Sequence, residues 1–198
     1  MEIVFATNNR HKLEEISSKL GEDFRIIGLK ELGLDQEIPE DHDTLEANAS
    51  QKAWFIHERS GKNVFADDTG LEVEALDGEP GVYSARYCRM GHPVFPDMDS
   101  VEGNMKKLLQ LMEGESNRRA RFRTVIALVI NGKEHQFEGI VEGEIMESKS
   151  GSGGFGYDPV FRPLGEELSF AEMDLEAKNK ISHRGRAVEE LVHFLSGM

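Results

Sequence analysis

The feature that most constrains the fold is a long hairpin pattern in the second half of the chain. Residues 119–130 and 134–145 are two runs with many apolar residues, and Asn131-Gly132 lies between them. An Asn-Gly pair between two such runs is a strong signal for a β-hairpin, because both residues accept the positive φ angles of a tight turn. We therefore expect a long pair of antiparallel strands, which excludes a purely parallel sheet.

The first half of the chain alternates between short apolar runs and amphipathic segments. Strands are expected within residues 2–6, 23–29 and 63–66. A helix follows the first strand, and its residues at helical spacing are Leu13, Ile16 and Leu20. A second helix opens at Asp43, since Asp43 and Glu46 have the spacing of a capping box. The buried stripe of that second helix consists of Leu45, Ala49, Ala53 and Ile56.

The remaining segments complete an α/β pattern. Residues 77–81 are expected to form a turn, 99–112 a helix and the glycine-rich stretch 151–156 a loop. The tail from Asp174 is expected to be helical, with Ser182 as a candidate cap for the final helix. Its inward-facing residues are Ala187, Leu191 and Phe194. Because strands and helices alternate before the hairpin, we predict an α/β protein with a mixed sheet flanked by helices, and the hairpin contributes to a second lobe.

Composition excludes several classes of protein. The 198 residues suit one domain or two tightly joined lobes. A formal net charge of −14 argues against binding to a nucleic-acid polymer, which requires a basic face. The longest apolar runs are too short to span a bilayer, and the first residues lack the features of a signal peptide. Because Cys88 is the only cysteine, no intrachain disulfide is possible, and we expect a cytoplasmic protein.

A candidate phosphate site follows the first strand. Thr7, Asn8 and Asn9 are residue types that cap helices, and a helix N-terminus after a strand presents backbone N–H groups to an anion. Lys12 adds a cation that can reach a phosphate. The alternative is an ordinary capped helix with a surface lysine.

Two adjacent carboxylates, Asp67 and Asp68, follow the apolar run at residues 63–66. Both can face one cleft only if the strand ends there, which Thr69-Gly70 favours. One carboxylate can then hold Mg²⁺ while its neighbour accepts a proton from an attacking water. The alternative is a turn in which an aspartate caps backbone amides. Glu40 is a further candidate metal ligand, or else a solvated loop residue.

Two later motifs combine aromatic and basic residues. In Gly153–Phe161 (GGFGYDPVF), glycines allow a close backbone approach, and Phe155 and Tyr157 offer faces on which a base can stack. The alternative is a turn followed by a core aromatic residue. In the segment 178–184 (KNKISHR), the basic side chains are suited to phosphate or carbonyl groups. The alternative there is a basic, solvated helix end. The basic side chains are Lys178, Lys180, His183 and Arg184.

Taken together and in this order, these motifs resemble the inosine triphosphate pyrophosphatase family, which hydrolyses non-canonical purine nucleoside triphosphates. The resemblance rests on Thr-x-Asn-x-x-Lys at residues 7–12, the acidic pair, GFGYDPVF and Ser-His-Arg at residues 182–184. Further matches are TLEANA at residues 44–49 and GEPGVYSAR at residues 78–86. The resemblance therefore extends over nearly the whole chain.

The resemblance implies an elongated, twisted mixed sheet flanked by helices, with two lobes around a central nucleotide-binding cleft. Residues 1–198 would form this one domain, and the protein would be a homodimer. ITP, dITP and XTP would be cleaved to a monophosphate and pyrophosphate with Mg²⁺ as the metal.

The resemblance also implies roles for individual residues. Glu40 and Asp68 would hold the metal, and Asp68, supported by Asp67, would accept the proton of water. The triphosphate would be bound by Thr7, Asn8, Asn9, Lys12 and Thr69. The nucleoside pocket would be lined by Phe155, Gly156, Tyr157 and Asp158. The base and the phosphates would be contacted by Lys178, His183 and Arg184.

The specificity has a physical basis in the 6-carbonyl of inosine and xanthosine bases, where adenine carries an amino group. A pocket that donates hydrogen bonds at this edge rejects adenine, and His183 and Arg184 are candidate donors. Two other functions are consistent with parts of the sequence. A phosphomonoesterase would release orthophosphate, but its acidic residues are not normally adjacent. A nucleotide sensor without activity would be expected to lack the acidic pair.

Overall fold

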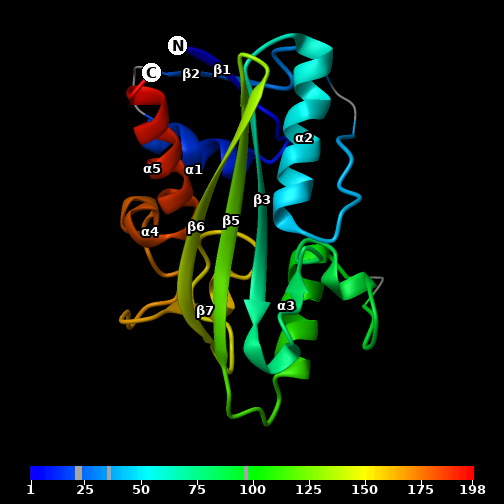
Figure 1. Ribbon diagram of the computed structural model, residues 1–198. Coiled ribbons are helices and arrows are strands. Elements are labelled where there is room, and N and C mark those ends of the chain that lie inside the picture. The colour runs from blue at the N-terminus through cyan, green and yellow to red at the C-terminus, as the bar shows by residue number, and fades with distance from the viewer. Residues whose placement is uncertain (21–23, 35–36, 96–97) are drawn as a thin grey trace. The chain divides into compact units, whose positions relative to one another are not determined.

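The computed structural model describes residues 1–20, 24–34, 37–95 and 98–198 (Figure 1). The strands are β1 (Glu2–Phe5), β2 (Arg25–Gly28), β3 (Val64–Val73), β4 (Pro80–Gly81), β5 (Arg119–Ile130), β6 (Lys133–Ile145) and β7 (Phe161–Pro163). The α-helices are α1 (Arg10–Leu20), α2 (Leu45–Ser60), α3 (Ser100–Leu111), α4 (Leu175–Ile181) and α5 (His183–Ser196). Single turns of 3₁₀ helix are η1 (Glu74–Leu76), η2 (Tyr87–Arg89) and η3 (Asp158–Val160).

The strands form one mixed sheet in the order β2-β1-β3-β5-β6-β7, and β4 pairs with β3. Strand β1 is parallel to β2 and to β3, whereas β4 and β7 are antiparallel to their neighbours. The β5–β6 hairpin turns at Asn131 and Gly132, which have φ angles of 52° and 70°. The expected mixed α/β architecture and its central hairpin are therefore confirmed.

The chain divides into two compact units. Unit 1 contains residues 1–68, 124–140 and 179–198, and unit 2 contains residues 69–123 and 141–178. Strands β3, β5 and β6 each run through both units. The expectation of one domain over residues 1–198 stays a prediction.

In unit 1, helices lie on both faces of the sheet. Helices α1 and α5 pack side by side against alternate residues of β1, β3 and β5 (Figure 1). The buried side chains of this layer are Ile3, Phe5, Ile16, Phe65, Ile126, Leu128, Ile130, Ala187, Val188, Leu191 and Leu195. Because successive side chains of a strand face opposite sides, Val64, Ala66 and Asp68 face away from this layer and toward α2. Hydrogen bonds from α2 to Asp68 confirm this direction.

The predicted buried stripe of α2 is confirmed, but its cap is not the predicted one. Thr44, rather than Asp43, is the N-cap, and its hydroxyl accepts from the N–H of Ala47. Glu46 is therefore one position too early for a capping box, although it still lies in the first turn, where an acidic side chain is favourable.

The C-terminal tail is helical as expected, with a break between α4 and α5. Ser182 caps α5, because its hydroxyl accepts from the N–H of Gly185 at 3.0 Å. Ala187 and Leu191 are fully buried, as predicted, and Phe194 packs against the same core. Asp23 and the side chain of Leu20 lie outside the described residues. In the part of the chain that the structure describes, no helix has both the length and the apolar character needed to cross a bilayer.

Candidate active site

The loop between β1 and α1 is held by its own polar side chains. Asn9 caps α1, since its side-chain oxygen accepts from the N–H groups of His11 and Lys12 at 3.0 and 3.3 Å. The N–H of Asn9 in turn donates to the hydroxyl of Thr7 at 3.1 Å. Asn8 is exposed. The predicted cap is therefore confirmed in this loop, whereas phosphate binding there stays a prediction.

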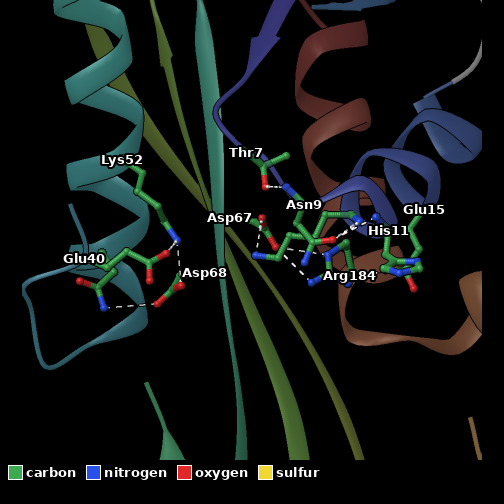
Figure 2. A network of polar contacts seen from close by, with 11 residues as sticks. Thr7, Asn9, His11, Glu15, Glu40, Lys52, Asp67, Asp68 and Arg184 are labelled. Carbon is green, nitrogen blue, oxygen red and sulfur yellow. Dashed lines mark hydrogen bonds and ion pairs between the residues drawn. The ribbon is translucent and has the colours of Figure 1, made fainter. Parts of the chain in front are cut away.

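The sequence predicted that β3 ends at the acidic pair, and this prediction was wrong. Strand β3 continues through Asp67 and Asp68 to Val73, so the two side chains point to opposite faces of the sheet. Figure 2 shows Asp67 directed toward Arg184 and Asp68 directed toward Lys52. The repulsion between the two carboxylates is offset, because Asp67 is bound by Lys12 and Arg184 and Asp68 is bound by Lys52.

Asp67 belongs to a buried cluster that contains two acidic and two basic side chains. Its Oδ1 accepts from Lys12 Nζ at 2.9 Å, and its Oδ2 accepts from Nε and Nη2 of Arg184, both at 3.2 Å. The remaining nitrogen of that guanidinium, Nη1, donates to Glu15 (Figure 2). We call Asp67, Lys12, Arg184 and Glu15 the Asp67 cluster. It joins β3 to α1 and α5.

The environment fixes the charge of this cluster. Burial alone would raise the pKa of Asp67, but the charges of Lys12 and Arg184 outweigh burial and hold the pKa far below its usual range. Burial lowers the pKa of Lys12, against the opposing effect of Asp67. Asp67 is therefore a permanently charged anchor for these two cations, rather than a group that exchanges protons.

Asp68 lies in a second cluster, on the face covered by α2. Lys52 Nζ donates to Asp68 Oδ1 at 2.8 Å and to Glu40 Oε1 at 2.5 Å. Asn48 Nδ2 donates to the other oxygen of Asp68 at 3.4 Å. We call Asp68, Glu40, Lys52 and Asn48 the Asp68 cluster. Glu40 is thus engaged in an ion pair, although its side chain is more exposed than that of Lys52.

In the Asp68 cluster, the pKa of the aspartate is shifted in the opposite direction to that of Asp67. Burial raises the pKa of the Asp68 carboxyl, and the charge of Lys52 offsets this only in part. For Lys52, burial would lower the pKa, but the charges of Asp68 and Glu40 raise it. The environments of the two neighbouring aspartates therefore push their pKa values in opposite directions, as is typical of a pair with an anchoring and a proton-accepting member.

Two carboxylates that share one cation also fit a metal-binding role. Glu40 and Asp68 come from different segments and converge on one ammonium group. Mg²⁺ is commonly held by one or two carboxylates, with the remaining oxygens from phosphates and water. Among the described residues, no three His, Cys, Asp or Glu side chains are placed to hold a metal ion by themselves. Such a site would be completed by the substrate.

Sequence reasoning missed Lys52, Asn48 and Glu15. Lys52 and Asn48 lie at the same helical positions as the apolar stripe of α2, and both are buried. A lysine within a stripe of alanine and isoleucine is unusual, because burying an unpaired charge costs free energy. The position of Lys52 within the apolar stripe was therefore the one sign in the sequence that it has a functional partner. Glu15 had no comparable signal in the sequence.

In unit 2, the motif GFGYDP is organised by Asp158. Its Oδ2 accepts from the N–H of Phe155 and from Nζ of Lys178, both at 2.7 Å. The Lys178 ammonium also lies 4.8 Å from the centre of the Phe155 ring. Gly154 and Gly156 have positive φ angles on either side of Phe155. Asp158 therefore fixes the turn that presents this half-buried ring.

Tyr157 is buried, unlike Phe155. Its hydroxyl donates to the carbonyl of Ser84 at 2.9 Å, and burial raises the pKa of this phenol well above its ordinary value. The interpretation of Tyr157 as a core aromatic is thus borne out by its position. Its role in a nucleoside pocket stays a prediction, as does that of Thr69, which is half-buried in the same unit.

The basic segment before and at the start of α5 is not a solvated helix end. Lys178, His183 and Arg184 are all buried, and Arg184 is only 1% exposed. Lys178 belongs to unit 2, whereas His183 and Arg184 belong to unit 1. Lys180 is exposed, so the solvated interpretation holds only for that residue.

A family model and full-length relatives both match nearly the whole chain, and they agree on one family. Residues 3–194 match the model of the Ham1 family. A dITP/XTP pyrophosphatase from Porphyromonas gingivalis is 53% identical over 194 residues, which cover 98% of this chain and 96% of the relative. A dITP/XTP pyrophosphatase from Flavobacterium johnsoniae is 47% identical over 196 residues, which cover 99% and 98% of the two chains.

Solved structures agree with these sequence matches. The Ham1 protein of Staphylococcus aureus is 39% identical with a TM-score of 0.86, and the match covers 100% of this chain and 99% of that one. A nucleoside-triphosphatase / dITP/XTP pyrophosphatase from Mycobacterium abscessus is 36% identical with a TM-score of 0.74, covering 96% and 98%. The resemblance inferred from the motifs is confirmed.

Proposed function

The chain belongs to the Ham1 family, and we propose that it hydrolyses non-canonical purine nucleoside triphosphates to the monophosphate and pyrophosphate. ITP, dITP and XTP are the expected substrates. Their hydrolysis removes these nucleotides from the pool before they are incorporated into DNA or RNA.

The observation that carries this proposal is the placement of the two adjacent aspartates of β3 on opposite faces of the strand, where Asp67 binds Lys12 and Arg184 while Asp68 converges with Glu40 on Lys52. Asp67 is locked in its charged form by Lys12 and Arg184, while burial raises the pKa of Asp68. A carboxylate with a raised pKa is a better proton acceptor near neutral pH. Asp68 is therefore assigned to accept the proton of the water that attacks the triphosphate.

Mg²⁺ is the metal we propose, held by Glu40 and Asp68. When bound, it offsets the negative charge of the phosphates and so favours attack by water. The convergence of these two carboxylates on Lys52 supports a cation at this position. Lys12 lies at the start of α1 and retains some exposure, which suits an additional contact with the phosphates.

Recognition of the base is assigned to the two motifs later in the chain. Phe155 provides a half-buried ring for stacking, held in place by Asp158 and Lys178. His183 and Arg184 are the proposed donors to the 6-carbonyl. Since Arg184 already donates to Asp67 and Glu15, we expect His183 to make the larger contribution.

One assay tests the proposed reaction. Purified protein with Mg²⁺ is given dITP, XTP, dGTP and dATP, and pyrophosphate and orthophosphate are measured separately. We expect pyrophosphate from dITP and XTP, with much slower turnover of dGTP and dATP. Orthophosphate as the main product would reject the proposed bond cleavage.

The oligomeric state and location are also proposals. We expect a cytoplasmic homodimer, on the basis of the family resemblance. Size-exclusion chromatography with light scattering would detect the dimer, and a single species at the mass of one chain would contradict it.

A further inference from the structure

The position of Lys52 suggests a role that goes beyond pairing charges in the core. We propose that its ammonium group is the built-in counterion of the metal site, which a divalent cation has to displace from Glu40 and Asp68 in order to bind them. This inference rests on the proposed function, because it assigns those two carboxylates to the metal. Lys52 is then a positioning residue that sets the affinity of the site for metal.

The geometry places one cation where another would bind. Lys52 Nζ is 2.5 Å from Glu40 and 2.8 Å from Asp68, so it bridges the two carboxylates. Its side chain is only 6% exposed, whereas that of Glu40 is 38% exposed. The ammonium therefore reaches the carboxylates from the interior, and a metal ion would approach from the side of Glu40.

The charges make the two cations competitors. The two carboxylates carry two negative charges and Lys52 carries one positive charge, so the group retains one negative charge that attracts a second cation. An ammonium and a divalent ion on the same oxygens would repel each other strongly in a buried setting. The flexible stem of lysine allows Nζ to turn away, and a bound triphosphate offers it new oxygens.

A purely structural role for Lys52 makes the opposite prediction about metal binding. If Lys52 only fastens the segment around Glu40 to α2, its removal would loosen the carboxylates and weaken metal binding. If Lys52 is a competing counterion, its removal takes the ammonium away from Glu40 and Asp68 and strengthens metal binding. The sign of the change separates the two roles.

The test uses Mn²⁺ as the probe and the protein without nucleotide, with free Mn²⁺ measured by electron paramagnetic resonance. Lys52→Met keeps most of the side-chain volume and removes the charge. We expect it to bind Mn²⁺ about 10- to 100-fold more tightly, the equivalent of one charge-assisted hydrogen bond. Glu40→Gln identifies the site, because the same Mn²⁺ binding should be lost in that variant.

Lys12→Met is the matched control. It removes the same charge near the acidic pair, but Lys12 is hydrogen-bonded to Asp67 and acts on Asp68 only as a more distant charge. Its effect on Mn²⁺ binding should be at most about threefold, because the interaction between two charges weakens with distance. Equal tightening in both lysine variants, or no tightening in Lys52→Met, would overturn the inference. If Glu40→Gln binds Mn²⁺ as tightly as the wild-type protein does, the inference is overturned as well.

A measurement on the unmodified protein covers the case in which Lys52→Met does not fold. Acetic anhydride labels accessible lysines, and mass spectrometry locates the label. Addition of Mg²⁺ should raise labelling of Lys52 several-fold and leave Lys107, a buried lysine bonded to main-chain carbonyls, unchanged. Unchanged labelling of Lys52 would contradict the inference. The two proposals can fail separately. If the Mn²⁺ and labelling results are as expected but the protein releases no pyrophosphate from dITP, the proposed function is rejected and the role of Lys52 in metal binding stands.

Discussion

Replacement of Arg184 by methionine should destabilise this protein more than any change to a surface ion pair. Arg184 is 1% exposed and donates to both carboxylates of the Asp67 cluster. The cluster holds two acidic and two basic groups, so Arg184→Met leaves one buried negative charge uncompensated. Removal of one partner from such a buried group costs about 3–5 kcal/mol of the free energy of unfolding.

The assay is unfolding by urea, followed by circular dichroism, with thermal unfolding as a second measure. For a chain of this size, the expected loss corresponds to a fall in Tm of about 6–20 °C. Arg25→Met is the control, because Arg25 also pairs with two carboxylates, Glu2 and Glu31, but its side chain is 69% exposed. That substitution should cost at most about 1 kcal/mol.

The double variant Glu15→Gln with Arg184→Met sharpens the argument. It removes one buried negative charge together with the positive charge, so part of the lost stability should return. A loss below about 1 kcal/mol in Arg184→Met, or one equal to that of Arg25→Met, would refute the reasoning. It would mean that Arg184 does not neutralise the Asp67 cluster.

Three further predictions follow from particular residues. The folded pKa of Asp67 lies below its unfolded value of 3.8, so its charge adds stability above that pH, and this share is lost as the pH falls. Asp67→Asn should therefore flatten the loss of stability between about pH 5 and pH 3 in urea unfolding, and an unchanged slope would contradict this. Asp68→Asn should reduce dITP turnover by about 10²- to 10⁴-fold with an unchanged circular dichroism spectrum, and near-normal activity would remove Asp68 as the proton acceptor. Gly139→Ala would place a Cβ against the carbonyl of His183, and a cost of about 1–3 kcal/mol is expected in the same unfolding assay; no cost would show that β6 and α5 can move apart freely.

Local sequence patterns predicted most elements of the fold. The alternation of apolar residues, the Asn-Gly turn and the helical stripe of Leu45, Ala49, Ala53 and Ile56 each depend on neighbours close in sequence. Such patterns report the backbone conformation directly, because they follow the period of a strand or a helix. The errors occurred where local rules offer two close solutions, as at the Thr44 cap.

The end of β3 was mispredicted because both carboxylates were expected to face one cleft and Thr69-Gly70 was taken as the end of the strand. In the folded chain, each aspartate meets cations from a different helix, and these contacts outweigh the local preference. Lys12 and Arg184 lie 55 and 117 residues from Asp67 in the sequence. No local rule relates residues at such separations.

The sequence by itself therefore determined the order of the elements, the mixed sheet and most of the candidate site residues, although not Lys52, Asn48 or Glu15, because these follow from short-range periodicity and recognisable motifs. Only the tertiary structure decided how those side chains are partnered. It put Asp67 and Asp68 on opposite faces of one strand, gave each its own cations and brought Lys52 between Glu40 and Asp68. The physical reason is that charge and burial act through space, so the properties of each carboxylate depend on helices far away along the chain.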